Sequence, residues 1–151
     1  MRVIIQRVAQ ARVTVSDMEI GRIGRGYLLL VGFRAGDGEA ILQRMAQKIV
    51  ELRINDDGQG RMNLAVGDVG GALLSVSQFT LYADCRHGRR PSFTDAAPAP
   101  QARILYERFN EILRKYGLPV STGQFQADMQ VSLVNDGPVT VMLDSTDWED
   151  K

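Results

Sequence analysis

The chain has 151 residues, the size of one domain, and folding at this length buries roughly two-thirds of the unfolded surface, so a core without disulfides is feasible. Its 18 Lys and Arg balance its 18 Asp and Glu, and it contains one histidine, His87, and one cysteine, Cys85. These counts exclude an internal disulfide, a paired-cysteine redox motif and any metal centre that requires two histidines or several cysteines.

The first predicted elements along the chain are strands. Residues 3–8 are rich in Val and Ile and are typical of a strand, and residues 11–15 alternate between apolar and polar side chains, as in a strand with one buried face. Glycines within residues 21–26 indicate turns before a continuously apolar strand at 27–31. Because these glycines lie between strands rather than before a helix, they do not indicate a dinucleotide-binding loop.

The middle of the chain combines a helix, a turn and a strand. Apolar side chains within residues 39–52 repeat at the helical period and predict an amphipathic helix, which a polar turn at 55–60 follows. Residues 73–81 have the pattern of a strand, and residues 83–100 form a polar loop rich in Arg, Pro and Ala.

A second helix and two further strands are expected in the last third of the chain. The apolar stripe of residues 101–116 predicts the helix, and the glycine and proline within 117–119 end it. Strands are predicted at 129–134 and 139–143, with a turn at residues 135–138 between them.

These elements predict an α+β fold with a single domain over residues 1–151. We expect a mostly antiparallel curved sheet or barrel-like β core with two main helices, without the alternating βαβ order of a doubly wound fold. The most apolar run, residues 27–33, is far shorter than the roughly 18 apolar residues that a membrane-spanning helix needs. The N-terminus also lacks the long apolar core of a signal peptide, so the cytoplasm is the expected location and no membrane partner is expected.

Hydroxyl side chains near the end of the 73–81 strand are candidate nucleophiles. Ser75, Ser77 and Thr80 are weak nucleophiles unless a neighbouring base removes the proton. The nearest candidate base in the sequence is His87, so a hydrolase that combines His87 with a Ser or Thr hydroxyl on small esters is one open hypothesis.

The 83–100 loop contains the densest cluster of positive charge. Arg86, Arg89 and Arg90 can grip phosphate groups with two hydrogen bonds each, and Phe93 could stack on a base. A solvated loop without a ligand explains the same residues, although loops of this length in compact domains are often functional. The composition alone does not decide between a phosphate-binding loop and a solvated loop.

Two segments resemble the signature motifs of the bacterial-type D-aminoacyl-tRNA deacylases. They are Ser77–Asp84, with the sequence SQFTLYAD, and Leu133–Thr140, with the sequence LVNDGPVT. The resemblance extends in the same order over nearly all 151 residues. Three positions depart from it: Asn55, where the family often has an aromatic residue, His87, where it more often has lysine, and Gln126, where it commonly has glycine.

The resemblance implies a homodimeric esterase that cleaves the bond between a D-amino acid and the 3′-terminal adenosine of tRNA. Glycine mischarged on tRNA is a further substrate of this family. Selectivity in the family comes from a Gly-cis-Pro element that enters the partner's pocket and excludes L-amino acids. Here that element corresponds to Gly137 and Pro138, with Arg7 helping to hold it and Met129 near the pocket.

The implied chemistry needs no metal and no cofactor. The resemblance places Ser77, Gln78, Phe79 and Thr80 in the pocket floor. It assigns stabilisation of the oxyanion to backbone N–H groups near Phe79 and Thr80, and assistance in proton transfer to the 2′-hydroxyl of the tRNA. Thr80 is then expected to position the substrate rather than to attack it.

Arg86, Arg89 and Arg90 are the expected contacts to the tRNA acceptor end, and no DNA partner is expected. The remaining alternative is a tRNA-binding module that has lost catalysis. Such a module should have lost Gln78, Thr80 or the Gly-Pro pair, all of which the chain retains.

Overall fold

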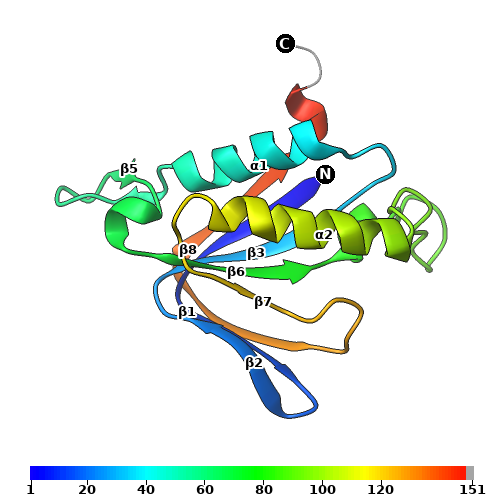
Figure 1. The fold of residues 1–151 in the computed structure, drawn as a ribbon, viewed down its shortest axis with the longest axis horizontal. Coiled ribbons are helices and arrows are strands. Elements are labelled where there is room, and N and C mark those ends of the chain that lie inside the picture. Colours follow the sequence, from blue (N-terminus) through cyan, green and yellow to red (C-terminus); the bar gives the residue numbers. More distant parts are fainter. Residues whose placement is uncertain (149–151) are drawn as a thin grey trace.

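The computed structural model describes residues 1–148 and contains a six-stranded sheet with two helices on one face (Figure 1). The main sheet consists of β1 (Arg2–Val15), β2 (Met18–Ile23), β3 (Gly26–Gly32), β6 (Ala72–Ser77), β7 (Val120–Thr122) and β8 (Gln130–Asp144). The helices are α1 (Glu39–Glu51) and α2 (Ala99–Arg114), and a small hairpin is formed by β4 (Asn55–Asp56) and β5 (Met62–Leu64). Short 3-10 turns occur at η1 (Gly67–Val69), η2 (Phe79–Tyr82) and η3 (Ser145–Trp148). This confirms the predicted α+β class with two main helices.

The sheet is mixed and strongly curved. β1 is central and pairs antiparallel with β2, β3 and β8, whereas β3 with β6 and β6 with β7 are parallel pairs. These parallel pairs differ from the mostly antiparallel sheet expected from the sequence. Helices α1 and α2 lie on the connections between the paired strands. The hairpin of β4 and β5 interrupts the first connection and obscures its βαβ pattern in the sequence.

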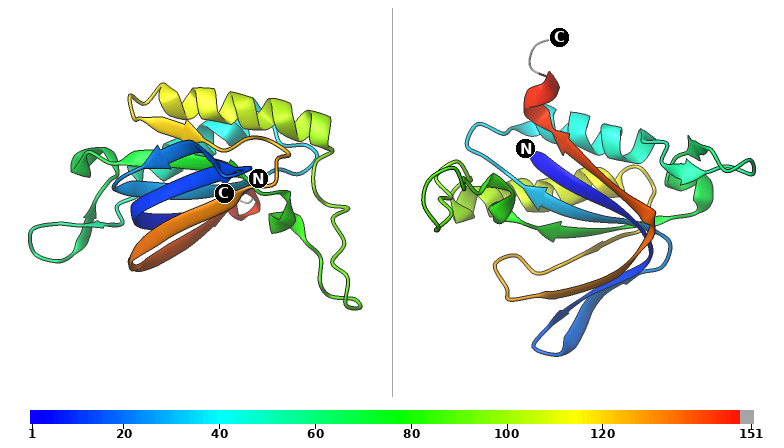
Figure 2. Two further views of the ribbon diagram at one scale, coloured as in Figure 1. Left: turned by 90° about the horizontal axis from the view of Figure 1, so that it is seen from below. Right: turned by 180° about the vertical axis from the view of Figure 1, so that it is seen from behind.

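The sheet nearly closes on itself where β2 approaches β7 (Figure 2). The Ser121 hydroxyl on β7 donates to the carbonyl oxygen of Arg22 on β2 at 3.2 Å. A Cβ atom at Gly21 would lie 2.9 Å from the carbonyl oxygen of Thr122, so only glycine allows this approach. The barrel-like core predicted from the sequence is therefore confirmed, with its closure at this seam.

Two apolar cores pack on opposite faces of the sheet. The helices bury one face of β1 and β3 through side chains that include Met45 and Ile49 of α1 and Phe109 and Leu113 of α2. The second core fills the inside of the curved sheet and contains Val8, Ala11, Val13, Ile23, Leu28, Leu74 and Val76. The helical stripes are thus confirmed, although α2 begins at Ala99 and ends at Arg114, two residues earlier than expected at both ends.

The expected turn at residues 135–138 is wrong, because β8 is one continuous strand. Its pairing with β1 jumps from Gln6–Thr140 to Val8–Asn135, so the residues between them bulge out of the ladder. The Asn135 side chain accepts from the Val139 N–H at 2.7 Å and donates to the Val139 carbonyl oxygen at 3.2 Å. The turn-forming chemistry of Asn135 is therefore present, but it closes a bulge instead of a hairpin.

Two further strand predictions are corrected. The expected strands at 3–8 and 11–15 are one strand, β1. The expected strand at 73–81 ends at Ser77, and the chain then turns into η2, with the Leu81 N–H donating to the Gln78 carbonyl oxygen at 3.2 Å. Strand alternation therefore does not extend to Phe79 and Thr80. Among residues 1–148, no helix is long and apolar enough to cross a membrane.

Candidate active site

A pocket of about 730 Å³ opens at one end of the sheet, between the end of β6 and the start of α2. Its wall is mostly apolar and comes from β3, β6, η2, the loop before α2, the start of α2, the segment before β8 and the start of β8. The lining residues are Val31, Phe33, Val76, Ser77, Gln78, Phe79, Phe93, Ala96, Ala97, Pro98, Ala99, Ala102, Phe125, Gln126, Ala127, Asp128, Met129 and Val131. Apolar pockets with a few polar groups are typical of small-ligand sites.

Four of the residues predicted for the site line this pocket: Ser77, Gln78, Phe79 and Met129. Thr80 does not line it, but its hydroxyl accepts a hydrogen bond from the Gln78 side-chain amide. Gln78 immediately precedes η2 and Thr80 lies within it, so this hydrogen bond spans the start of the turn.

The backbone N–H groups of Phe79 and Thr80 stand at the start of η2. The first N–H groups of a helical turn have no carbonyl partner within that turn. Within residues 1–148, neither group donates to another backbone or side-chain atom. Two backbone donors are therefore available next to the pocket wall.

Met129 reaches the pocket because Gly123 leaves space for it. A Cβ atom at position 123 would lie 2.7 Å from the Met129 sulfur, which is closer than such atoms approach in folded proteins. The Gly123 N–H also donates to the carbonyl oxygen of Ser75 at 2.9 Å, which attaches this segment to β6.

Aromatic side chains form the mouth of the pocket. The rings of Phe79 and Phe93 meet edge to face with their centroids 5.0 Å apart, and 54% of Phe79 is exposed. Phe125 and Gln126, in the segment between β7 and β8, also line the pocket. Sequence reasoning did not assign Phe125 to the site, since only the folded chain brings it next to residues 77–79.

Gly137 and Pro138 lie outside this pocket, in the exposed bulge of β8, and the peptide bond between them is cis. Gly137 has φ +141°, and a Cβ atom there would lie 3.1 Å from Nη2 of Arg7 and 2.7 Å from Cγ2 of Val139. Position 137 therefore requires glycine.

Arg7 holds the Gly137–Pro138 bulge from beneath. Its guanidinium is buried and donates from Nε to the Asp136 carbonyl oxygen at 2.8 Å and from Nη1 to the Ile54 carbonyl oxygen at 2.7 Å. The carboxylate of Asp56 lies 3.4 Å from Nη1 and offsets part of the buried charge.

The three arginines of the 83–98 loop differ in their partners. The Arg86 guanidinium makes two hydrogen bonds to Asp84, at 2.9 and 2.7 Å, and the Arg86 backbone N–H donates a third at 3.0 Å. These bonds lower the pKa of the Asp84 carboxyl to about 2. Arg89 and Arg90 are exposed, and neither is paired with a carboxylate in the described chain. The loop also carries His87, which is exposed and does not line the pocket.

The described residues, 1–148, contain no group of three or more His, Cys, Asp or Glu side chains placed to hold a metal ion. The polar groups at the pocket are instead an amide, hydroxyls and backbone N–H groups. Such a site can orient a carbonyl compound and stabilise negative charge on its oxygen.

Comparisons with known proteins agree with this arrangement. The sequence profile of the D-Tyr-tRNA(Tyr) deacylase family matches residues 4–144. A D-aminoacyl-tRNA deacylase of Heliobacterium modesticaldum is 58% identical over 149 residues, which is 99% of both chains.

Two solved structures are also similar. One is described as the c-Myc DNA Unwinding Element Binding Protein, with 40% identity, a TM-score of 0.90 and coverage of 95% of this chain and 98% of the other. The second is described as a probable eukaryotic D-amino acid tRNA deacylase and is 19% identical, with a TM-score of 0.78. The match covers 94% of this chain and 97% of the other, and at this identity it supports the fold alone.

Proposed function

The chain belongs to the D-Tyr-tRNA(Tyr) deacylase family and has D-aminoacyl-tRNA deacylase activity, and on this premise we propose how its residues bind, select and hydrolyse the substrate. The observation that carries the proposal is the pocket wall at Ser77, Gln78 and Phe79, which adjoins two backbone N–H groups that have no partner among residues 1–148. The aminoacyl group enters this pocket with its ester carbonyl directed at η2.

Hydrolysis then requires little from side chains. Water attacks the ester carbonyl carbon, and the oxyanion that forms accepts hydrogen bonds from the N–H groups of Phe79 and Thr80. When the oxyanion collapses, the bond to the 3′-oxygen of the terminal adenosine breaks, and the proton released by the attacking water passes to that oxygen with help from the neighbouring 2′-hydroxyl of the tRNA. The products are the free D-amino acid and tRNA, and neither a metal nor a cofactor takes part.

In this scheme Gln78 and Thr80 position the substrate. Their mutual hydrogen bond fixes the side-chain amide of Gln78 against the pocket wall. Orientation of an already activated ester supplies a large part of the rate enhancement, since the reacting groups no longer need to find one another by diffusion.

Chiral selection comes from a second copy of the chain. Gly137 and Pro138 are exposed and outside the pocket of their own chain, which fits insertion into a partner's pocket. The inserted bulge would occupy the space that the side chain of an L-amino acid needs. Glycine has no side chain, so glycine mischarged on tRNA remains a substrate.

The exposed apolar surface supports this homodimer. Phe79 is 54% exposed at the pocket mouth, and Met142, on β8 beyond the bulge, is 64% exposed. Among the described strands, β8 pairs only with β1 and leaves its other edge available. Exposed apolar side chains beside a free strand edge are typical of a protein interface.

The tRNA acceptor end would lie along the 83–98 loop. Arg89 and Arg90 have no carboxylate partner in the part of the chain that the structure describes, so phosphate oxygens can take up their donors, while Arg86 would have to release Asp84. We propose the cytoplasm as the location, which is consistent with a substrate attached to tRNA.

We propose tRNA rather than DNA as the nucleic acid, although one similar structure is described as a DNA-unwinding-element binding protein. A pocket of this volume accommodates an amino acid ester, and reading a duplex needs no such cavity. The alternative hydrolase that depends on His87 is not supported, because His87 lies exposed outside the pocket.

Separate kinetics on D-Tyr-tRNA and L-Tyr-tRNA test the proposal. We expect rapid release of D-tyrosine and little attack on the L-ester, with no effect of excess duplex or single-stranded DNA. Equal rates on the two enantiomers would refute the proposed selection, and inhibition by DNA at stoichiometric concentration would refute the assigned partner.

A further inference from the structure

Arg103, on the second turn of α2, places a positive charge at the rim of the pocket. Its guanidinium lies over the ring of Phe125, 4.9 Å from the ring centroid, and Nη2 donates to Oε1 of Gln126 at 3.3 Å. Phe125 and Gln126 both line the pocket, whereas Arg103 itself is exposed. The two contacts together fix the position and the plane of the guanidinium.

The charge of Arg103 has no carboxylate partner within residues 1–148. Arg108, on the same helix, is instead held by Glu39 at 2.6 Å and Glu111 at 3.0 Å. Asp128 is the acidic residue of the pocket wall, and it forms no ion pair with Arg103. An oriented guanidinium that lacks a counter-charge is suited to an anionic ligand.

Gln126 contributes to this arrangement through an unusual backbone conformation. Its φ of +61° lies in the left-handed region, which residues other than glycine rarely adopt. In that conformation its side-chain oxygen reaches Arg103. Since one N–H of the guanidinium is used by Gln126, its remaining donors are free to bind a second partner.

We infer that Arg103 binds the phosphate on the 5′ side of the terminal adenosine of the tRNA. This inference rests on the proposed function, which places the aminoacyl ester in the pocket. The 5′ phosphate of a nucleotide is separated from its 3′ ester by a single ribose, so it must lie near the rim of a pocket that holds the ester. Arg103 is the oriented cation at that rim.

The test compares a substrate that carries this phosphate with a minimal substrate that lacks it. D-Tyr-tRNA carries the phosphate, and 3′-D-tyrosyl-adenosine lacks it. For Arg103→Ala we expect kcat/KM on D-Tyr-tRNA to fall roughly tenfold, mainly through KM, because an exposed charge-assisted contact is lost. On 3′-D-tyrosyl-adenosine the same variant should match the wild type.

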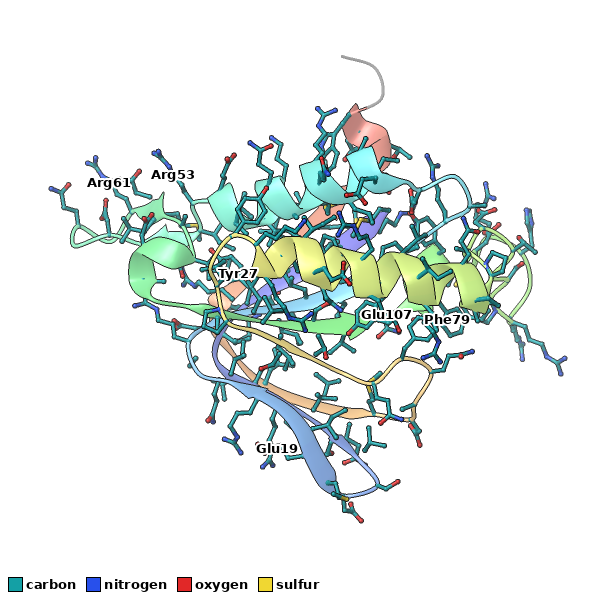
Figure 3. The ribbon with its side chains drawn as sticks, in the orientation of Figure 1. Glu19, Tyr27, Arg53, Arg61, Phe79 and Glu107 are labelled. Carbon is teal, nitrogen blue, oxygen red and sulfur yellow. The ribbon has the colours of Figure 1, made fainter. Side chains whose placement is uncertain are left out.

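Two more variants sharpen the result. Arg103→Lys keeps the charge without the planar fork and should lose only part of the affinity for D-Tyr-tRNA. Gln126→Gly keeps the left-handed backbone and removes the contact to Arg103, so it should raise KM for D-Tyr-tRNA roughly two- to threefold. Arg61→Ala is the control, since Arg61 lies at the end of the molecule opposite Phe79 (Figure 3) and should not change either substrate.

Salt dependence gives an independent measure. One lost contact to a single-stranded phosphate should reduce the slope of log affinity against log salt by about 0.7 in Arg103→Ala. An unchanged KM and salt slope, or an equal loss on both substrates, would overturn the assignment of Arg103. Failure of the wild type on both substrates would instead refute the proposed function, so the two failures are distinguishable.

Discussion

The Nε atom of Arg7 donates to the carbonyl oxygen of Asp136 at 2.8 Å, and this bond joins the central strand to the bulge that carries Gly137 and Pro138. The same guanidinium reaches the Ile54 carbonyl oxygen, in the segment between α1 and β4. A buried cation therefore connects three separate segments of the chain. The position of the bulge depends on the planar fork of an arginine as well as on its charge.

Replacement of Arg7 tests this dependence. Arg7→Lys cannot serve both carbonyl oxygens with the same geometry, so it should lower the free energy of unfolding by about 1–3 kcal/mol. It should also reduce discrimination between D-Tyr-tRNA and L-Tyr-tRNA. Arg12→Lys, an exposed position on the same strand, is the control for urea unfolding and for the ratio of the two rates. An Arg7→Lys protein with full stability and full discrimination would contradict the role of Arg7.

The space beside Gly123 controls where Met129 lies. Gly123→Ala should displace the Met129 side chain, because the new Cβ atom would lie 2.7 Å from its sulfur. We expect kcat/KM for D-Tyr-tRNA to fall roughly tenfold, since a small displacement in a pocket is sufficient for such a loss. Glycine on tRNA should be affected less. Gly58→Ala is the matched control, as nothing lies within 4 Å of its Cβ position. Equal losses for the two substrates would argue against a change confined to the side-chain space.

The hydroxyl of Thr80 is a positioning group in this account. Thr80→Ala removes the acceptor for the Gln78 amide and should reduce kcat by no more than roughly tenfold, the effect of one lost hydrogen bond. His87→Ala should leave kcat unchanged. Single-turnover assays with mass spectrometry of the quenched enzyme would check both statements. An acyl group trapped on Thr80, or complete loss of activity in folded His87→Ala, would contradict them.

The ion pair between Glu39 and Arg108 connects the two helices and predicts a dependence of stability on pH. Hydrogen bonds from Arg108 and then Gln43 lower the pKa of Glu39 from 4.5 to about 2. Because the pKa is lowered in the folded protein, this contribution is fully present above pH 4.5 and is lost as the pH falls towards 2. Glu39→Gln and Arg108→Gln should therefore lose less stability than the wild type over that range. Parallel curves of unfolding free energy against pH for all three proteins would rule this out.

The helices could be predicted from the sequence, whereas the position of Phe79 at the pocket could not be predicted from strand alternation. Met45, Ile49, Phe109 and Leu113 repeat at the helical period, and the core on that face of the sheet follows directly from their spacing. Phe79 is harder to place, because the apolar and polar alternation of β6 continues in the sequence after the backbone has turned into η2.

Contacts between distant segments could not be predicted from the sequence. Asn135 has the same local chemistry in a hairpin turn and in a strand bulge, and only the pairing of β8 with β1 decides between them. Arg103 carries no motif that would assign it to a pocket, and its contacts with Phe125 and Gln126 form only in the folded chain. These three residues come together because α2 crosses over the sheet and returns the chain to β7, parallel to β6.

The most direct test of a site shared between two copies is a complementation measurement. One chain carries Gly137→Ala, with an intact pocket, and the other carries Gln78→Ala, with an intact bulge. The purified heterodimer then has one pocket that faces an intact partner bulge. We predict that it hydrolyses D-Tyr-tRNA at about half the wild-type rate and rejects L-Tyr-tRNA. Neither mutant homodimer should combine these two properties, because one lacks an intact bulge and the other lacks an intact pocket. A heterodimer that only averages the defects of its parents would show that each bulge serves its own pocket, and would contradict the shared site.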